Sequence, residues 1–279
     1  MNAEQLSPTG RFERILLATD GSEYAAGATR EAIAIAAKCG AQLHVVTVVR
    51  TNAEYESLAP KLVEQAEAQA RERLDAVSTQ AQAAGLACET LIRHGEDAYP
   101  EIVAAAEATN ADVIVMGRRG RSGLMRLMMG GNTGRVIGHA RCAVLVVPRA
   151  AGIIGKPLLL ATDGSRHGDA AAQSAVALAK RCGAALTVLS VAGDGKSLDE
   201  AQRVVDRSIA LIGEQGVQAE GLTLSGRPDE VITRTAEERG AGLIVMGSHG
   251  RTGLDRLLVG SVSERVIGHA QAAVLVVRL

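Results

Sequence analysis

The chain has 279 residues, of which 47% are hydrophobic and 22% are charged, and its formal net charge is −1. This balance is typical of a folded globular protein and excludes a disordered chain. Neither half carries the basic excess of a general nucleic-acid binder. The apolar runs are far shorter than the ~20 residues that span a bilayer, so we expect no membrane helix.

The N-terminal segment Met1–Arg11 is polar and contains Glu4. A secretory signal needs an apolar stretch after a basic start, so we expect a flexible tail over residues 1–11 and a cytoplasmic protein. One Phe, three Tyr and no Trp are too few aromatics for stacking single-stranded nucleic acid. The four cysteines are scattered without a nearby His, which favours reduced structural thiols over a metal site. Cys39 and Cys182 each precede a glycine, where helix packing is the expected role.

An internal repeat divides the chain into two copies. Residues 18–22, Ala-Thr-Asp-Gly-Ser, return at 161–165, and 19 of the 31 positions of 117–147 are identical in 247–277. The offset falls from 143 to 130 between these regions, so the second copy is shorter by about 13 residues. The repeat predicts a first domain over 12–149, a linker over 150–156 and a second domain over 157–279.

Each copy alternates short apolar strands with helical patterns. In the first copy we expect strands at Ile15–Asp20, Leu43–Val49, Ala87–His94, Val113–Met116 and Ala143–Val147, with helices at Ser22–Cys39, Ala59–Ala84, Ala98–Thr109 and near Gly134–His139. In the second copy we expect strands near Leu158–Asp163, Leu186–Val191, Ala219–Leu224, Leu243–Met246 and Ala273–Val277. Ser197 and Glu200 form a predicted capping box. The alternation predicts an α/β fold of two tandem doubly wound domains, each a five-stranded parallel sheet flanked by helices.

Glycines gather after the fourth strand of each copy, at the edge of the sheet where ligands of such folds bind. The second copy reads Gly247-Ser-His-Gly250, then nine residues, then Gly260-Ser261-Val262-Ser263. Glycines let the backbone approach a ligand, and the free N–H groups of a helix start attract an anion, so this loop suits a polyphosphate. The alternative is that the glycines only form turns and that Ser263 only caps the helix.

The first copy keeps the spacing with Gly117, Gly120 and Gly130, but Gly131 stands where the second copy has Ser261. Gly131 still offers a backbone N–H, and Thr133 keeps the hydroxyl two residues on, so the sequence predicts a weakened pocket. Four arginines in this loop are explained equally well by phosphate binding, by an exposed face or by an interdomain salt bridge: Arg118, Arg119, Arg121 and Arg126.

Asp20 and Asp163 end the first strand of the two copies. A carboxylate there accepts hydrogen bonds from ribose hydroxyls or caps the helix that follows, and both interpretations stay open. Val48 and Val191 end the second strand, where main-chain groups can meet the edge of a base.

With these residues the sequence resembles the universal stress protein family in its tandem two-domain form, over about residues 12–148 and 156–278. The family signature is glycine, two residues, glycine, nine residues, glycine and Ser or Thr. The second copy matches it fully, and the first departs from it at Gly131. The resemblance implies a Rossmann-like fold of the adenine nucleotide alpha hydrolase type that binds ATP. A Mg²⁺ ion bound with the ATP would need a nearby carboxylate, and Asp20 and Asp163 are the obvious candidates.

The resemblance also implies which residues hold the nucleotide. In the second copy they are Ala161, Thr162, Asp163, Val191, Met246, Gly247, Gly250, Gly260, Ser261, Val262 and Ser263. In the first copy they are Ala18, Thr19, Asp20, Val48, Met116, Gly117, Gly120, Gly130, Gly131 and Thr133. Family members dimerise through their last strands, so we expect Ala143–Val147 and Ala273–Val277 to pair within one chain and two chains to form a homodimer.

Three functional classes remain open on the sequence. The first is an ATP-binding stress-response regulator with protein partners that the sequence does not name. The second is an enzyme that hydrolyses ATP slowly, and the third is a dimeric scaffold whose pockets bind another ligand or nothing. No general base is evident beside the glycine loop, so we expect a regulator with weak ATP hydrolysis at most and no catalytic residues.

Overall fold

The computed structural model describes residues 12–119, 129–193, 195, 197–250 and 259–278, so the tail 1–11 and Gly120 lie outside the described residues. The strands are β1 (Arg14–Ala18), β2 (Gln42–Arg50), β3 (Cys88–Gly95), β4 (Val113–Gly117), β5 (Ala143–Val147), β6 (Leu158–Ala161), β7 (Leu186–Ala192), β8 (Ala219–Ser225), β9 (Leu243–Gly247) and β10 (Ala273–Val277). The helices are α1 (Ala26–Cys39), α2 (Ala53–Leu58), α3 (Pro60–Ala83), α4 (Ala98–Ala108), α5 (Gly131–His139), α6 (Arg166–Cys182), α7 (Leu198–Glu214), α8 (Pro228–Glu238) and α9 (Ser261–His269).

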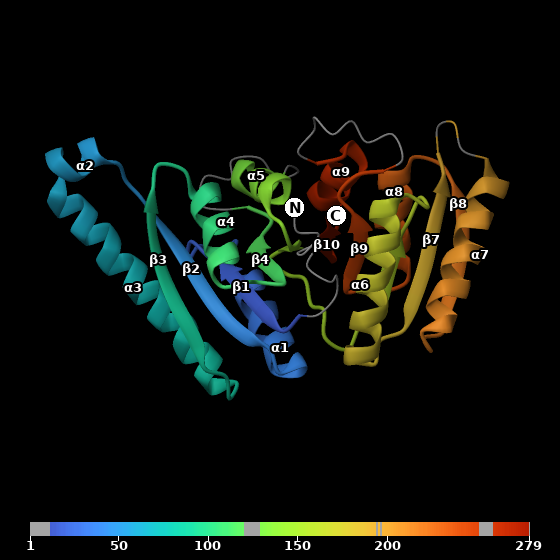
Figure 1. The fold of residues 1–279 in the computed structure, drawn as a ribbon, viewed down its shortest axis with the longest axis horizontal. Coiled ribbons are helices and arrows are strands. Elements are labelled where there is room, and N and C mark those ends of the chain that lie inside the picture. Colours follow the sequence, from blue (N-terminus) through green and yellow to red (C-terminus); the bar gives the residue numbers. More distant parts are fainter. Residues whose placement is uncertain (1–11, 120–128, 194, 196, 251–258, 279) are drawn as a thin grey trace, which may run out of the picture.

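All the described strands join one sheet, in the order β3-β2-β1-β4-β5-β10-β9-β6-β7-β8 (Figure 1). Within each half the neighbouring strands pair in parallel, whereas β5 and β10 pair antiparallel at the seam between the halves. Leu145 of β5 pairs with Leu275 of β10, its own counterpart in the repeat. A local two-fold axis therefore passes through this pair and relates the two halves.

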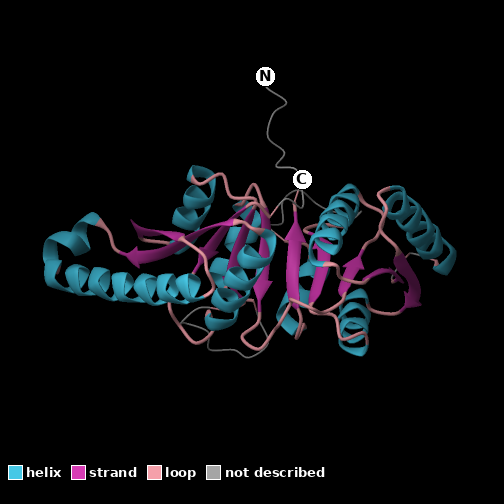
Figure 2. Ribbon diagram, turned by 90° about the horizontal axis from the view of Figure 1, so that it is seen from below, coloured by secondary structure: helices cyan, strands magenta, loops and turns pink. Residues whose placement is uncertain are grey.

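Helices cover both faces of the sheet (Figure 2). One apolar core lies under α1, α3, α6 and α7, and a second lies under α4, α5, α8 and α9. Alternate seam residues enter the two cores, so Leu145 and Leu275 face the first and Val144 and Val274 face the second. The two halves thus share both cores, and strands buried on both faces account for the continuous apolar runs of the sequence.

Two arginines reach across the seam. Arg118, directly after β4, donates from Nη1 to the carbonyls of Gly268 and Ala270, both at 3.0 Å. Arg278, directly after β10, donates from Nη1 to the carbonyl of Ile137 at 2.7 Å. These carbonyls end α9 and α5, where helices have unsatisfied acceptors and a negative dipole end. Of the alternatives for Arg118, the interdomain role is the one that the structure shows, with carbonyls rather than a carboxylate as its partners.

The connection between the halves lies along α1. The Glu31 carboxylate, which is almost fully buried, accepts a hydrogen bond from the Ile153 N–H at 2.9 Å. Arg30 donates to the carbonyl of Ala151 and is paired with Glu31 at 3.0 Å. These bonds satisfy a charge that would otherwise be costly to bury.

The predicted strands are confirmed in chain order, but β1 and β6 end at Ala18 and Ala161, two residues before the expected Asp20 and Asp163, and helix starts also need correction. Helix α1 begins at Ala26 rather than Ser22, because the Asp20 Oδ1 accepts hydrogen bonds from the Ser22 N–H at 3.0 Å and from its hydroxyl at 2.6 Å. That local bonding holds the chain in a turn and competes with helix formation. The long helix begins with Pro60 in its first turn, and α2 precedes it as a separate helix.

The starts of α5, α9 and α7 can also be compared with the sequence prediction. Helices α5 and α9 begin at Gly131 and Ser261, about three residues earlier than expected for the first of them. The capping box of Ser197 and Glu200 is confirmed at the start of α7, with both reciprocal hydrogen bonds present. Among the described residues, no helix combines the length and the apolar character that a bilayer span needs.

Because Leu275 sits fully buried at the seam, Leu275→Ala is expected to lower the free energy of unfolding by about 2–5 kcal/mol. Urea denaturation followed by circular dichroism measures this loss. Leu62→Ala is the matched control, since the Leu62 side chain is 51% exposed and its truncation should cost less than about 0.5 kcal/mol. Equal losses in the two variants would contradict a shared core at the seam.

Candidate functional site

A cleft of about 950 Å³ opens in the second half, at the carboxyl ends of its strands. It lies between the segments that follow β6 and β9, the last residues of β7 and the first turns of α8 and α9. Every second-copy residue that the resemblance assigns to nucleotide binding lines this cleft: Ala161, Thr162, Asp163, Val191, Met246, Gly247, Gly250, Gly260, Ser261, Val262 and Ser263. Residues that lie far apart in the sequence are therefore brought to one place.

Asp163 lines the cleft and follows the last residue of β6, Ala161, after Thr162. Its Oδ1 accepts a hydrogen bond from the Ser165 N–H at 3.0 Å, and the cap of α6 is Ser165, whose hydroxyl accepts from the Gly168 N–H at 3.1 Å. The interpretation of Asp163 as the helix cap is therefore wrong. A Cβ atom on Gly250 would lie 2.8 Å from the Asp163 Oδ2, so the missing side chain lets the loop approach this carboxylate.

The glycine loop is tied to the start of α9. The Ser263 hydroxyl donates to the carbonyl of Gly247 at 2.9 Å, and the Gly260 N–H donates to the carbonyl of Ser248 at 2.9 Å. Ser263 thus connects the helix to the loop, and the interpretation of this side chain as a helix cap is wrong. The cap position is Gly260, without a side-chain hydrogen bond. Ser261 is exposed in the first turn of α9, where backbone N–H groups and the positive dipole end favour an anion.

Apolar side chains form another part of the cleft. Leu189 and Val191 come from β7, Ile232 comes from α8, and Met246 comes from β9. Leu189, Ile232 and Met246 are buried, and Val191 is partly buried against the same core. Such a surface suits a flat apolar group, with the polar loop on the other side of the cleft.

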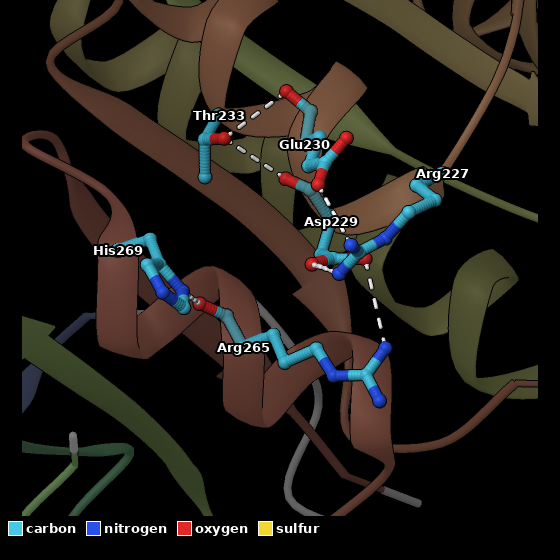
Figure 3. Close-up of polar contacts among 6 residues, drawn as sticks. All are labelled: Arg227, Asp229, Glu230, Thr233, Arg265 and His269. Carbon is cyan, nitrogen blue, oxygen red and sulfur yellow. Dashed lines mark hydrogen bonds and ion pairs between the residues drawn. The ribbon is translucent and has the colours of Figure 1, made fainter. Parts of the chain in front are cut away.

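A network of charged residues from α8 and α9 also lines the cleft, and the sequence analysis did not find it (Figure 3). The Asp229 carboxylate, whose side chain is 7% exposed, lies 3.1 Å from Arg227 Nη2 and 3.8 Å from Arg265 Nη1. Arg227 is also paired with Glu230 at 2.8 Å. The contact between Asp229 and Arg265 connects α8 to α9. A signal was available, because Arg227 follows the third strand of the copy at the ligand-binding edge.

Two histidines meet beside the glycine loop. His249 lines the cleft, and its ring centroid lies 5.5 Å from that of His167 in the first turn of α6. Burial lowers the pKa of His167 below its ordinary value, and the nearby His249 and Arg278 lower it further. At neutral pH this imidazole is therefore uncharged.

The first half shows the same local design. The Thr133 hydroxyl donates to the carbonyl of Gly117 at 3.2 Å, and the Gly130 N–H donates to the carbonyl of Arg118 at 3.0 Å. Ala18 is the last residue of β1 and pairs with Met116 of β4, and Thr19 and Asp20 follow it. Val48 lies on β2, and Gly131 is the first residue of α5. Among the described residues, no atom lies within 4 Å of the place where a Cβ on Gly131 would stand. The half thus keeps the hydrogen bonds between the segment after β4 and the start of α5, and it lacks the hydroxyl that Ser261 supplies in the second half.

The His pair gives a testable titration. The pKa of His167 is expected below its ordinary value of 6.5, and His249→Asn should raise it, because the variant removes one of the neighbours that lower it. Since the folded state binds the proton less well, the free energy of unfolding falls as the pH drops below about 6.5. Proton NMR of the ring resonances measures the pKa, and His139→Asn in the first half is the control. A pKa above 6.5 in the wild type would contradict this account.

Comparison with known proteins agrees with the repeat and the fold. A universal stress protein of Methanocaldococcus jannaschii is 36% identical over 139 residues, which cover 44% of this chain and 82% of that protein. A universal stress protein of Mycolicibacterium smegmatis is 32% identical over 210 residues, or 70% of each chain. The crystal structure of a universal stress protein from Archaeoglobus fulgidus has a TM-score of 0.79 at 26% identity and covers 96% of this chain and 98% of that one.

The family model called universal stress protein family matches the chain twice, over residues 11–148 and 155–278. These segments correspond to the two halves of the sheet, each with five strands and its own glycine loop. The repeat, the fold and the two matches lead to one conclusion. The chain belongs to the universal stress protein family.

Proposed function

We propose that the cleft of the second half binds an adenine nucleotide, with ATP as the main ligand, and that its occupancy regulates a stress response. The observation that carries this proposal is the convergence of the complete glycine signature, Asp163 and the end of β7 around one cleft of about 950 Å³. Pockets of this size accommodate small ligands and cofactors.

Each part of ATP has a chemically suitable part of the cleft. The apolar residues Val191 and Ile232 suit adenine, and the Asp163 carboxylate suits ribose hydroxyls as a hydrogen-bond acceptor. The N–H groups at the start of α9, with the Ser261 hydroxyl, suit the phosphates. The close approach of Gly250 to Asp163 supports this assignment, because any side chain at that position would occupy the space between loop and carboxylate.

Mg²⁺ would accompany ATP through the phosphate oxygens, because this ion keeps several waters and needs one or two carboxylates at most. Asp163 and Glu200 are carboxylates that line the cleft, and Oε2 of Glu200 also accepts a hydrogen bond from the Ser197 N–H at 3.0 Å. When bound, the ion neutralises phosphate charge, and these two side chains are the candidates to hold it.

The first half is proposed as a weaker nucleotide site. Its loop keeps the hydrogen bond of Thr133 to Gly117, but Gly131 supplies no hydroxyl. Occupancy of the second half alone would then set the state of the chain at low ATP concentration.

We also propose that two chains associate into a homodimer, and sedimentation equilibrium measures this association.

Exchanging the residues at the equivalent positions 131 and 261 tests the nucleotide site in both halves. Ser261→Gly should weaken ATP binding by about 1.5–3 kcal/mol, roughly tenfold or more in Kd, because it removes a donor to a charged group. Gly131→Ser should strengthen first-half binding, since the space around Gly131 is open. Equilibrium dialysis with labelled ATP gives the affinity and the number of nucleotides per chain. An unchanged affinity in Ser261→Gly would count against the assignment of the phosphates.

Gly260→Asp places a negative charge at the start of α9 and is expected to weaken ATP binding by ~3 kcal/mol or more, over a hundredfold in Kd. A Cβ at this position would lie 3.0 Å from the Ser248 carbonyl oxygen, so Gly260→Ala is the control for crowding alone. Circular dichroism verifies folding. If ATP binds Gly260→Asp at full strength, the proposed site is wrong. Steady ATP turnover that is lost in this variant would instead assign hydrolysis to the cleft.

A further inference from the structure

Cys39 and Cys182 meet across the seam between the two halves. They end α1 and α6 and occupy the same position in the two copies of the repeat. Helices α1 and α6 contact each other, and the Cys39 and Cys182 thiols lie within hydrogen-bonding reach of each other. Because the halves are related by a local two-fold axis, a residue close to this axis meets its own counterpart. A cysteine repeated at this position therefore faces a second cysteine.

The chain around both cysteines has room to adjust. Gly40 and Gly183 follow them in the left-handed conformation, each with φ of 63°. In the part of the chain that the structure describes, no atom lies within 4 Å of the place where a Cβ on either glycine would stand. Both cysteines are partly exposed, so a small solute can reach them. A disulfide needs a narrow range of distances and dihedral angles, and open helix ends make that geometry easier to reach.

The electrostatics of the pair favour a reactive thiol. The hydrogen bond from Cys39 lowers the pKa of Cys182 to about 7, and the positive charges of Lys38 and Arg181 act in the same direction. The thiolate is the nucleophilic form of cysteine, so the lowered pKa favours reaction at Cys182, although burial acts in the opposite direction. Cys142 differs, because burial raises its pKa to about 12.

We infer that Cys39 and Cys182 form a redox-sensitive site, at which a hydroperoxide oxidises the two thiols to a disulfide that joins the two halves. This role goes beyond the helix packing expected from the sequence. It concerns a site separate from the proposed nucleotide site, since neither cysteine lines the cleft of the second half.

The reaction balances with hydrogen peroxide as the oxidant. The Cys182 thiolate attacks one peroxide oxygen, the O–O bond breaks, and a sulfenic acid forms while hydroxide leaves and takes up a proton to become water. The Cys39 thiol then attacks the sulfenic sulfur, the S–O bond breaks, and a second water leaves with the thiol proton. Two thiols lose two electrons in total, and one peroxide is reduced to two waters.

Peptide mapping of the full chain tests this site. The reduced protein is treated with hydrogen peroxide, alkylated with iodoacetamide and digested without reduction. The expected result is a linked peptide pair that contains Cys39 and Cys182, with the free thiols falling from four to two per chain. Four thiols remaining after peroxide, or a disulfide that joins two chains on a non-reducing gel, would overturn the proposal.

Three variants determine the order of the steps. Cys39→Ser should lose the crosslink and leave Cys182 as a sulfenic acid that dimedone traps, whereas Cys182→Ser should lose both the crosslink and the dimedone adduct. Cys88→Ser is the matched control, because Cys88 is also a partly exposed free thiol but lies on β3, away from the seam. Loss of the crosslink in Cys88→Ser would contradict the assignment.

Discussion

The antiparallel pairing of β5 with β10 is the interaction on which the rest of the structure depends. Both strands consist of Ala, Val and Leu and are buried on two faces. In a single half such a strand would leave an apolar edge with unsatisfied N–H and C=O groups, which is an aggregation hazard. Pairing satisfies these groups and joins the apolar cores of the two halves. It also brings Arg118, Arg278 and the cysteine pair to positions from which they reach the opposite half.

The strands could be predicted because their chemistry is local. A strand covered by helices on both faces must be apolar at every position, and such runs are visible without any knowledge of the fold. Helix starts were less predictable, because the Asp20 side chain bonds to Ser22 and delays α1 until Ala26. The sequence left an interdomain contact open for Arg118 but could not name its acceptors, since these lie 150 and 152 residues away in the sequence.

The candidate site, like the fold, could be predicted only in part from the sequence. Glycine spacing and strand ends identified the loop and Asp163, because these features follow from the rule that ligands bind at the carboxyl edge of a parallel sheet. The network of Arg227, Asp229 and Arg265 was missed, since it depends on how α8 packs against α9. Side chains that act through contacts between helices leave no periodic signal in the sequence.

The two arginine contacts at the seam show what a fused chain permits. Their acceptors are equivalent, because both sets of carbonyls end the short helix before the last strand of a copy. The donors differ, since Ser248 and Pro148 occupy the positions that correspond to Arg118 and Arg278. In a dimer of identical subunits every substitution occurs twice, once on each side of the axis. In this chain the two sides are separate stretches of one sequence, so a substitution can alter one pocket or one contact while its counterpart is preserved.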